Sequence, residues 1–529
     1  MIRLATRNDA ALWLELLQEM LGSEYPAKEV YDPAWIAGEL DPSSGQETWV
    51  AEVNGRLHAS ISFLQPAGAN LNPIANLGRN LHHPESYAEG SSEALLRHVN
   101  HLVAERKQTI VVRVLAADNP QEMLYENLGY VCVGFQPLKH ILKTRQGVLF
   151  YVHMAGPGQV TRLPLSESLP QISELATVVL ASLNIPNPLQ VRDGVTGYPL
   201  HTELTIHDAT YEDFEVWRQQ LQKAHHAPEV STGFNRGCGL LRTTSNTPLR
   251  AILGQRESGI VSGLAYIHDE QDRCVRILDA FSTDETSIGT LFRHIDKIAQ
   301  EELSAAYLEV DVLMTAPRLL KSAEQLGFVP IAYLPAFFNR GGLCTDVVKL
   351  VKLNMVYETE FTALTDSAAV IVGTIDQNLE YYKTGQAVVN LLRTLSIFEG
   401  LGDGELRKIG RLFSQKLYRA GESVFQTADT GEQAYIVMSG QVNIYLDDPE
   451  HPVATMQSGQ ILGELTFLDN APRSVTAVAS QASILLVVHR AAFNDLVQKE
   501  PHLGLSVMRN LAMDLSHKLR RAVAARAAK

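Results

Sequence analysis

The sequence predicts a multidomain α/β plus β-barrel protein, in which two α/β units precede a small antiparallel β-roll with flanking helices. Three observations lead to this fold class. The chain has 529 residues, more than one hydrophobic core usually holds, since domains average about 150 residues. Two N-terminal stretches resemble each other at a separation of about 196 to 198 residues. Beyond residue 390, short apolar segments alternate with glycines. We therefore expect domains at 1–150, 155–355 and 391–529, with linker helices at 356–390.

The composition is that of a folded globular chain. Apolar residues make up 45% and charged residues 20% of the sequence, which excludes a mostly disordered protein. The formal net charge of −14 provides no broad basic surface, so we expect neither DNA nor a membrane as a partner. The start lacks the apolar run of a signal peptide, and no stretch of about 18 apolar residues is present. These features predict a cytoplasmic protein.

Four cysteines, Cys132, Cys238, Cys274 and Cys344, lie far apart in the sequence. Their spacing matches neither a disulfide framework nor a thiolate zinc site. We therefore expect buried or idle thiols and no bound metal.

The first unit begins with alternating strands and helices. We predict a strand over Ile2–Ala5, a helix over Ala10–Leu21, and strands over Thr48–Val53 and Leu57–Leu64. The last two strands are joined by Asn54-Gly55, a pair that favours a two-residue hairpin because both residues tolerate positive φ.

A glycine-bearing loop over residues 83–92 precedes a predicted helix at Glu93–Arg106 and a buried strand at Thr109–Leu115. A loop at a helix N-terminus directs free N–H groups at an anion, which suits a pyrophosphate. Taken alone, such a loop is more often an ordinary helix cap. His82 and His83 lie just before it. An imidazole can act as a base near neutral pH, although a structural histidine is the commoner case.

This block resembles the GNAT acyltransferase superfamily. The resemblance rests on the loop, on Asp118-Asn119-Pro120 after the strand, and on the segment Met123 to Val131, which contains Glu126-Asn127-Leu128-Gly129-Tyr130. It implies binding of acetyl-CoA as the acyl donor. Two positions depart from the pattern of the family: Tyr87 stands where a loop arginine is expected, and Ser92 where a small glycine or alanine is expected.

The resemblance also assigns roles to individual residues. It places the CoA contacts on Gly90, Ser91, Ser92 and Asn119. It makes Tyr125 the acid that protonates the departing thiolate, and His83 the candidate general base.

A second copy of this unit is expected at 155–355. Residues 95–102 match residues 291–298, and Glu126 to Tyr130 matches Glu324 to Phe328. In the second copy Thr286 stands opposite Gly90, Pro317 opposite Asn119, and Ala323 opposite Tyr125. We therefore interpret this copy as a degenerate, structural partner of the first.

The C-terminal part contains the most specific motif of the sequence. Segments 433–440 and 441–446 suggest a hairpin of a small barrel. In the segment Gly463 to Thr476, Arg473 follows Glu464 by nine residues. A glutamate can accept a hydrogen bond from a ribose hydroxyl, and a guanidinium can pair with phosphate oxygens. This pair fits a cyclic nucleotide.

Residues 391–490 resemble the cyclic-nucleotide-binding domain of bacterial catabolite regulators, kinase regulatory subunits and gated channels. The resemblance rests on the spacing from Gly463 through Arg473. The predicted nucleotide contacts are Gly463, Glu464, Leu465, Arg473, Ser474 and Thr476. A degenerate barrel that binds no nucleotide is the alternative. The choice between cAMP and cGMP stays open.

A last helix over Ser506–Arg521 carries one apolar stripe, formed by Met508, Leu511, Ala512, Leu515 and Leu519. This stripe would cover the base, form a homodimer seam or simply pack on the barrel. Because the sequence ends at Lys529, we expect no DNA-reading module after this helix.

Two functions remain. The first is a cyclic-nucleotide-regulated N-acyltransferase that moves an acetyl or other acyl group from CoA to an amine, such as a protein lysine. The second is a non-catalytic cyclic-nucleotide sensor with degenerate GNAT-like domains. The linker is the natural place for a regulatory relay, and we expect its residues 357–382 to form short helices.

Overall fold

The computed structural model describes most of the chain. The described residues are 1–23, 25, 28–44, 46–64, 74–106, 108–116, 119–141, 145–154, 162–163, 165, 167–192, 194–221, 229–230, 248–340, 343–355, 363–410, 412–446 and 448–527. They divide into two compact units, Met1–Leu379 (unit 1) and Glu380–Lys529 (unit 2). Asp118, Cys238 and residues 356–362 of the predicted linker lie outside the described residues.

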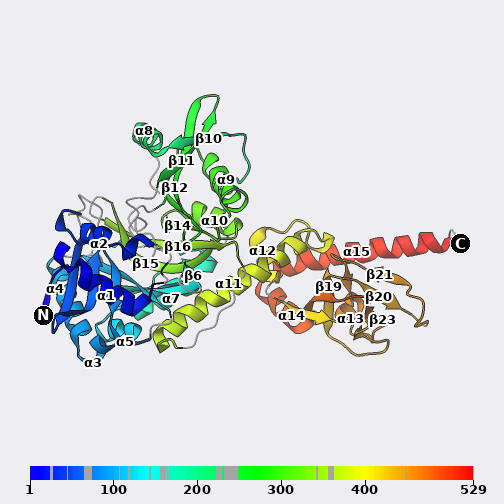
Figure 1. The fold of residues 1–529 in the computed structure, drawn as a ribbon. Helices are drawn as coiled ribbons and strands as arrows, with labels where there is room; N and C mark the ends of the chain where they lie inside the picture. The colour runs from blue at the N-terminus through cyan, green and yellow to red at the C-terminus, as the bar shows by residue number, and fades with distance from the viewer. Residues whose placement is uncertain are drawn as a thin grey trace. The chain divides into compact units, whose positions relative to one another are not determined.

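Unit 1 is built on a mostly antiparallel sheet of 14 strands, counted over the described residues (Figure 1). The strand order is β1-β2-β3-β4-β5-β7-β6-β15-β16-β14-β13-β12-β11-β10. Strands β1 to β7 form a first half and strands β10 to β16 a second half. Read from its outer edge inward, each half has the same strand order, and in each half one neighbouring pair is parallel, β4 with β5 and β13 with β14.

The bounds of the first half are as follows. Its strands are β1 Ile2–Leu4, β2 Glu47–Val53, β3 Arg56–Phe63, β4 Ile74–His82, β5 Thr109–Leu115, β6 Val131–Ile141 and β7 Arg145–Met154. Its helices are α1 Ala10–Leu21, α2 Pro33–Glu39, α3 Pro84–Ala88, α4 Ser91–Glu105 and α5 Asn119–Asn127.

The second half has these bounds. Its strands are β8 Glu167–Ser168, β9 Gln190–Val191, β10 Thr205–Thr210, β11 Leu249–Arg256, β12 Gly259–Asp269, β13 Cys274–Ser282, β14 Tyr307–Leu313, β15 Val329–Arg340 and β16 Leu343–Leu353. Its helices are α7 Pro170–Ser182, α8 Tyr211–Leu221, α9 Ser287–Glu301 and α10 Pro317–Gln325.

Predicted and observed elements agree closely at the start of the chain. The helix Ala10–Leu21 has the predicted bounds, and the predicted hairpin joins β2 to β3 through Asn54 and Gly55, whose φ angles are 50° and 80°. Both residues therefore adopt the positive φ that such a turn requires. The predicted loop over residues 83–92 is corrected in one respect. Pro84 opens a short helix, α3, because proline at the first helical position is already set in φ.

The residues matched between the two copies occupy the same places in the fold. Gly90 and Thr286 are the N-cap residues of α4 and α9, two helices of 15 residues each. Asn119 and Pro317 each begin a helix of 9 residues, α5 and α10. The internal repeat in the sequence therefore corresponds to equivalent helix starts in the two halves.

The predicted short linker helices are replaced by a single long helix. Helix α11, Asp366–Arg393, runs without a break for 28 residues. No proline interrupts this stretch, and a glycine inside a helix costs only about 1 kcal/mol. Gly373 therefore lowers the helix propensity of α11 without ending the helix.

Unit 2 contains two four-stranded antiparallel sheets among its described residues, ordered β17-β24-β19-β22 and β18-β23-β20-β21. The strands are β17 Phe413–Tyr418, β18 Ser423–Phe425, β19 Gln433–Ser439, β20 Val442–Tyr445, β21 Ala454–Met456, β22 Ile461–Leu462, β23 Thr476–Ala479 and β24 Ser483–His489. The helices are α12 Asp403–Gly410, α13 Glu464–Asp469, α14 Arg490–Lys499 and α15 Pro501–Ala527.

The predicted pairing of the segments 433–440 and 441–446 is wrong. Strands β19 and β20 belong to different sheets, and Gly440, with a φ of 92°, turns the chain from one sheet to the other. The turn is held by Ser483, whose Oγ accepts a hydrogen bond from Gln441 N at 3.0 Å. A Cβ at position 440 would lie 2.2 Å from that Oγ, so the corner requires glycine.

Helix α15 has two apolar faces. Leu503, Val507 and Leu511 are buried in the core of unit 2, whereas Leu505 and Met508 are exposed. The predicted stripe is therefore divided. Leu511 faces the barrel core, and Met508 and Ala512 lie on the solvent side. None of the helices in the described part of the chain is long and apolar enough to cross a membrane.

The two halves of unit 1 are joined by a buried charge cluster. Glu309 on β14 is fully buried and accepts hydrogen bonds from Gln136 Nε2 at 2.6 Å and Lys139 Nζ at 3.1 Å, both on β6. Arg276 and Lys349 also pair with it. Burial opposes ionisation, but these cations hold the pKa of Glu309 well below its usual range. Close backbone contact completes the junction, since a Cβ at Gly134 would lie 2.2 Å from the Cβ of Ala332.

Neutralising Glu309 tests this junction. We expect Glu309→Gln to lower the free energy of unfolding of unit 1 by about 3–5 kcal/mol, because it leaves buried cations without their counter-charge. All four tryptophans lie in unit 1, so tryptophan fluorescence during urea unfolding reports this unit. Glu301→Gln, at an exposed helical position, is the control and should change stability by less than about 0.5 kcal/mol. Equal stability of the two variants would contradict the proposed role of the cluster.

Candidate functional site

The guanidinium of Arg473 is the centre of the candidate site in unit 2. Its Nη1 donates to Gly463 O at 2.9 Å, and its Nη2 donates to Gln433 O at 2.7 Å. The guanidinium carbon lies 4.4 Å from the centre of the Phe425 ring and 5.8 Å from that of Tyr435. The carbonyl on β19, the carbonyl at the start of α13 and the two aromatic rings therefore hold the guanidinium in one orientation.

Two glycines make room for this side chain. Gly463 is the N-cap of α13 with a φ of 78°, and a Cβ there would lie 2.4 Å from Arg473 Nη1. A Cβ at Gly431 would lie 2.9 Å from Nη2. A side chain at either position would displace the guanidinium, and at 463 it would also strain the backbone.

Neutral carbonyl oxygens accept the two hydrogen bonds that Arg473 donates to Gly463 and Gln433. The residue is 4% exposed, and its Nε is buried without a hydrogen-bond partner among the described residues. Burial lowers the pKa of Arg473, while Tyr435, Asp429 and Glu464 act in the opposite direction through space. Arginine keeps its proton in proteins. A buried guanidinium held by carbonyl oxygens therefore creates a strong site for an anion.

The other predicted nucleotide contacts surround this cation. Glu464 begins α13, is half-buried and lies close enough to act electrostatically on Arg473. Leu465 and Ser474 are exposed. Thr476 Oγ1 accepts a hydrogen bond from Thr427 N at 3.0 Å, so this hydroxyl links β23 to the turn that follows β18.

Sequence reasoning missed the groups that hold Arg473. Phe425, Tyr435 and the carbonyl of Gln433 come from β18 and β19, about 40 to 50 residues before the arginine. Apolar alternation could have placed the two rings inside the barrel, but the pattern does not show which polar group they would meet.

In the first half of unit 1, a buried chain of hydrogen bonds connects several predicted site residues. Tyr125 Oη on α5 donates to Asn80 Oδ1 on β4 at 2.9 Å. His82 Nε2 is also hydrogen-bonded to Asn80 Oδ1, at 2.6 Å, and His82 Nδ1 is hydrogen-bonded to Ser92 Oγ at 2.7 Å. The predicted catalytic tyrosine and the predicted anion-binding loop are therefore linked through one strand.

This series of hydrogen bonds determines which ring nitrogen of His82 carries the proton. Because Asn80 Oδ1 can only accept, His82 Nε2 carries the proton and Nδ1 accepts from Ser92. Complete burial lowers the pKa of His82 to about 3, so the imidazole is neutral near pH 7. His82 is consequently a poor proton acceptor for chemistry.

The predicted cofactor residues lie at different depths. Gly90 and Asn119 occupy the starts of α4 and α5, and Ser91 is half-buried with its Oγ unpartnered among the described residues. Ser92 and Tyr125 are fully buried. The hydroxyl of Ser92 is used by His82 and Ser86, so the contact of Ser92 with CoA, which stays a prediction, would come from its backbone.

His83, the predicted base, caps α3. Its Nδ1 accepts a hydrogen bond from Glu85 N at 3.3 Å, and its Nε2 lies 3.7 Å from a Glu19 carboxylate oxygen. Its ring is one-fifth exposed. The base role of His83 stays a prediction.

The N-terminus of α11 rests on the helix that carries Tyr125. Thr365 N donates to Glu122 Oε2 at 3.1 Å, and Thr365 Oγ1 donates to Glu126 Oε1 at 2.6 Å. Ser367 also donates to Glu126, as does Tyr151 Oη at 3.0 Å. Two carboxylates of α5 therefore face the positive end of a 28-residue helix.

The comparisons with known proteins concern unit 2. Residues 415–500 match the family described as cyclic nucleotide-binding domain. The Cyclic AMP receptor protein of Thermus thermophilus is 33% identical over 129 residues, which are 24% of this chain and 58% of that protein. A cAMP-dependent protein kinase regulatory subunit of Eremothecium gossypii is 36% identical over 83 residues, 16% of this chain and 18% of that protein.

A solved cyclic nucleotide-binding domain from Methylobacillus flagellatus is also similar. It is 24% identical, and the match covers 26% of this chain and 80% of that structure with a TM-score of 0.25. The chain thus spans less than two thirds of the two relatives named above. Residues 415–500 form a cyclic nucleotide-binding domain.

The buried imidazole generates a testable pH dependence of stability. The folded-state pKa of His82, about 3, lies below the value of about 6.5 in the unfolded chain. Between these values the unfolded chain binds the extra proton, so stability falls as pH falls below about 6.5. From pH 7 to pH 5 this loss is about 2 kcal/mol. We expect His82→Gln to lose correspondingly less over this interval in urea unfolding followed by tryptophan fluorescence.

His101→Gln is the matched control, since this histidine lies in unit 1, which the tryptophans report, and is exposed, so the variant should keep the pH dependence of the parent chain. An unchanged pH dependence in His82→Gln would show that the buried imidazole is not the group responsible.

Proposed function

We propose that this chain is an N-acyltransferase, formed by the first half of unit 1, whose activity is regulated by a cyclic nucleotide bound in unit 2. The observation that carries the regulatory part is the buried guanidinium of Arg473, held by the carbonyls of Gly463 and Gln433 inside a cyclic nucleotide-binding domain. The transferase part rests on the arrangement of the first half and on the resemblance of its sequence to GNAT enzymes.

The nucleotide would be bound through its charge. Arg473 would donate to the cyclic phosphate, the N–H groups that follow Gly463 would add dipoles, and Glu464 would accept from the ribose 2′-hydroxyl. The relatives named for cyclic AMP make cAMP the first ligand to test, with cGMP beside it. Ser474 and Leu465 are exposed around this site and available for further contacts.

Removal of the cation tests nucleotide binding. We expect Arg473→Gln to weaken cAMP binding roughly a hundredfold or more in isothermal titration calorimetry, because a desolvated charge-assisted contact is lost. Arg473→Lys should recover part of the affinity, since it keeps the charge but not the fork. Arg419→Gln, on an exposed residue, should bind as the parent chain does. Unaltered affinity of Arg473→Gln for both nucleotides would refute the site.

Several features of the first half favour acyl transfer from CoA. The N-terminus of α4 has Gly90 as its cap, a residue without a side chain that could accept from the first N–H groups of the helix, and such groups are donors for an anion such as a pyrophosphate. Asn119 begins α5, and Tyr125 lies six residues further along the same helix. The second half carries Thr286, Pro317 and Ala323 at these positions, so the transferase chemistry is assigned to the first half alone.

The reaction would proceed by direct transfer. A base, with His83 as candidate, removes a proton from the ammonium, and the amine then attacks the thioester carbonyl. Backbone N–H groups stabilise the oxyanion, the C–N bond forms, and the C–S bond breaks. Tyr125 donates its proton to the departing sulfur. This last step requires Tyr125 Oη to leave Asn80 Oδ1, its acceptor at 2.9 Å.

The acid role has a direct test. We expect Tyr125→Phe to lower turnover of acetyl-CoA with an amine by about 10²-fold or more, while binding of acetyl-CoA changes little. Thiol release reports the turnover, and calorimetry reports the binding. Tyr130→Phe removes the neighbouring hydroxyl, which donates to Asn100, and serves as the control. Full turnover in Tyr125→Phe would eliminate the acid role.

Regulation would pass through α11. Its first turn contacts Glu122 and Glu126 of α5, and its last turns contribute Val388, Val389 and Leu392 to the core of unit 2. A nucleotide that changes the position of this helix relative to α5 would alter the helix that carries Tyr125. Such control requires that the nucleotide bind the two arrangements with different affinity.

Weakening the contact of α11 with α5 should make acetyl transfer independent of nucleotide binding. In Glu126→Gln we expect the ratio of acetyl transfer rates with and without cAMP to move toward one, because the hydrogen bonds from Thr365 and Ser367 lose their charged acceptor. Glu93→Gln, which affects an exposed ion pair with Arg97 on α4, is the control. A ratio equal to that of the parent chain would exclude this route.

The non-catalytic sensor is favoured by one observation, the complete burial of Tyr125 and Ser92. Thermal unfolding separates the two functions. At a hundred times its dissociation constant, a ligand stabilises the fold by about 2.7 kcal/mol. Stabilisation by cAMP together with none by acetyl-CoA would support the sensor. Homodimerisation through the exposed face of α15, at Leu505 and Met508, belongs to either function, and sedimentation measurements would test it.

A further inference from the structure

Each half of unit 1 has a gap between two parallel strands. Strands β4 and β5 pair over Ile74–Leu77 and Thr109–Val112, and β13 and β14 pair over Cys274–Ile277 and Tyr307–Val310. Beyond these residues the two strands of each pair continue without being partnered to each other. An unpaired strand edge offers backbone donors and acceptors to an extended ligand or segment.

In the second half this edge is occupied by the chain itself. Val230 forms an antiparallel bridge with Val312 of β14. Leu313 N donates to Glu229 O at 2.9 Å. Val230 is buried. Among the described residues, β5 of the first half forms no isolated bridge of this kind.

A second segment, residues 197–202, fills the space between α9 and α10. Tyr198 N donates to Ser322 Oγ of α10 at 2.7 Å. A Cβ at Gly289 of α9 would lie 2.5 Å from Pro199 O, so the segment also touches the other helix. Tyr198 Oη donates to Glu229 at 2.6 Å, which ties this segment to the one on β14.

The N-terminus of α9 is closed by a carboxylate of its own chain. Asp284 Oδ1 accepts from Thr286 N at 2.9 Å and from Ser287 N at 2.7 Å, and Arg256 Nε lies 3.2 Å from its Oδ2. Gly90, the equivalent cap of α4, has no side chain, and Ala88, which stands at the position equivalent to Asp284, carries no acceptor for these amides. The donors that α4 offers to an anion are therefore already used in α9.

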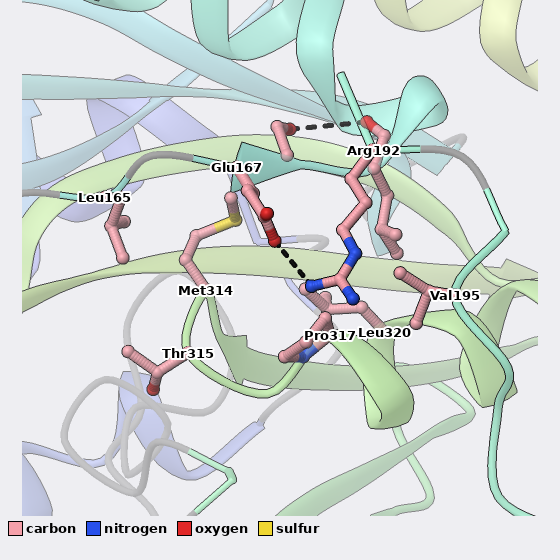
Figure 2. Close-up of a pocket in the computed structure, with 10 residues that line it drawn as sticks. Leu165, Glu167, Arg192, Val195, Met314, Thr315, Pro317 and Leu320 are labelled. Carbon is pink, nitrogen blue, oxygen red and sulfur yellow. Dashed lines mark hydrogen bonds and ion pairs between the residues drawn. The ribbon is translucent and has the colours of Figure 1, made fainter. Parts of the chain in front are cut away.

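A cavity of about 220 Å³ remains beyond the filled gap, where β14 ends and α10 begins. Figure 2 shows Glu167 and Arg192 facing each other over it, with Met314, Thr315, Pro317 and Leu320 along its wall. Arg192 Nη1 pairs with Glu167 Oε2 at 2.7 Å. The charge of this arginine is thus balanced by a neighbour and is not directed at a phosphate.

We infer that the second half is self-occupied: its own residues fill the strand edge, the helix groove and the helix N-terminus that the first half presents to a ligand. Among the described residues, the equivalents of these features that could receive an extended anionic ligand lie in the first half. The identity of this ligand as an acyl-CoA rests on the function proposed above. The conclusion that the second half is filled by its own residues does not depend on that function.

Hydrogen–deuterium exchange of the full chain with and without acetyl-CoA tests the inference. The peptides covering 285–290 and 311–316, and the amide of Tyr198 within the peptide covering 197–202, should exchange at least about a hundredfold more slowly than an unstructured chain without any ligand, because these amides are bonded internally. Acetyl-CoA should leave these rates unchanged and slow exchange around Gly90 and Asn119. Fast exchange of the three peptides, or their protection by acetyl-CoA, would overturn the inference.

If acetyl-CoA slowed exchange in neither half, the proposed binding of acetyl-CoA would be refuted. Slow exchange of the second half without ligand would still support its self-occupancy. A variant refines the test. We expect Asp284→Ala to speed exchange over 285–290 at least about tenfold, since two amides lose their acceptor. Asp41→Ala removes a comparable contact to Ser43 N and should leave 285–290 unaffected. No change in Asp284→Ala would contradict the closure of α9 by this carboxylate.

Discussion

The buried guanidinium of Arg473 constrains the geometry of unit 2 around it. Carbonyls of Gly463 and Gln433 are its hydrogen-bond acceptors, and two rings lie beside it. A carbonyl dipole offsets only part of a full charge, so the cation keeps a strong attraction for an anion. The same bond to Gly463 O fixes the start of α13. An anion that competes for the guanidinium therefore acts on the helix as well as on the arginine, which connects binding to conformation in a single contact.

Local chemistry made much of the fold predictable. The Asn54-Gly55 turn, the helix Ala10–Leu21 and the spacing from Gly463 to Arg473 depend on neighbouring residues, and all three are as expected. The pairing of β19 with β20 failed because a glycine turn between apolar segments is compatible with a hairpin and with a corner. Contacts of Gly440 with Ser483, more than 40 residues away, decide between them. The aromatic support of Arg473 was out of reach for the same reason.

The buried series of hydrogen bonds in the first half of unit 1 shows a further limit of sequence reasoning. Tyr125 and Ser92 were expected at a ligand, and the structure brings them together, but through Asn80 and His82 and below the surface. Nothing in the spacing of these four residues indicates that one carbonyl oxygen on β4 would serve both a tyrosine and a histidine. The sequence led us to group these residues, while their hydrogen-bond partners depend on how β4, α4 and α5 pack.

The two halves illustrate how one architecture can be kept while its sites diverge. The shared sheet and the charges around Glu309 require both halves, so loss of the second half would expose a buried ionic cluster. Its site is free to change, because the cluster depends on strands and not on the helix starts. At these helix starts of the second half, Asp284 accepts hydrogen bonds from the backbone of α9, and Pro317 has no N–H that would need an acceptor.

Helix α11 has a property that suits a relay. Glu122 is fully buried on α5 and accepts from Thr365 N at the start of α11. If α11 withdrew alone, a buried carboxylate would lose a hydrogen-bond donor and the positive end of a long helix, which is unfavourable in a low-dielectric environment. Either α5 follows α11, or Glu122 must reach water. Both alternatives change the helix on which Tyr125 lies, so a displacement of α11 cannot leave the hydrogen bond between Tyr125 and Asn80 in the same environment.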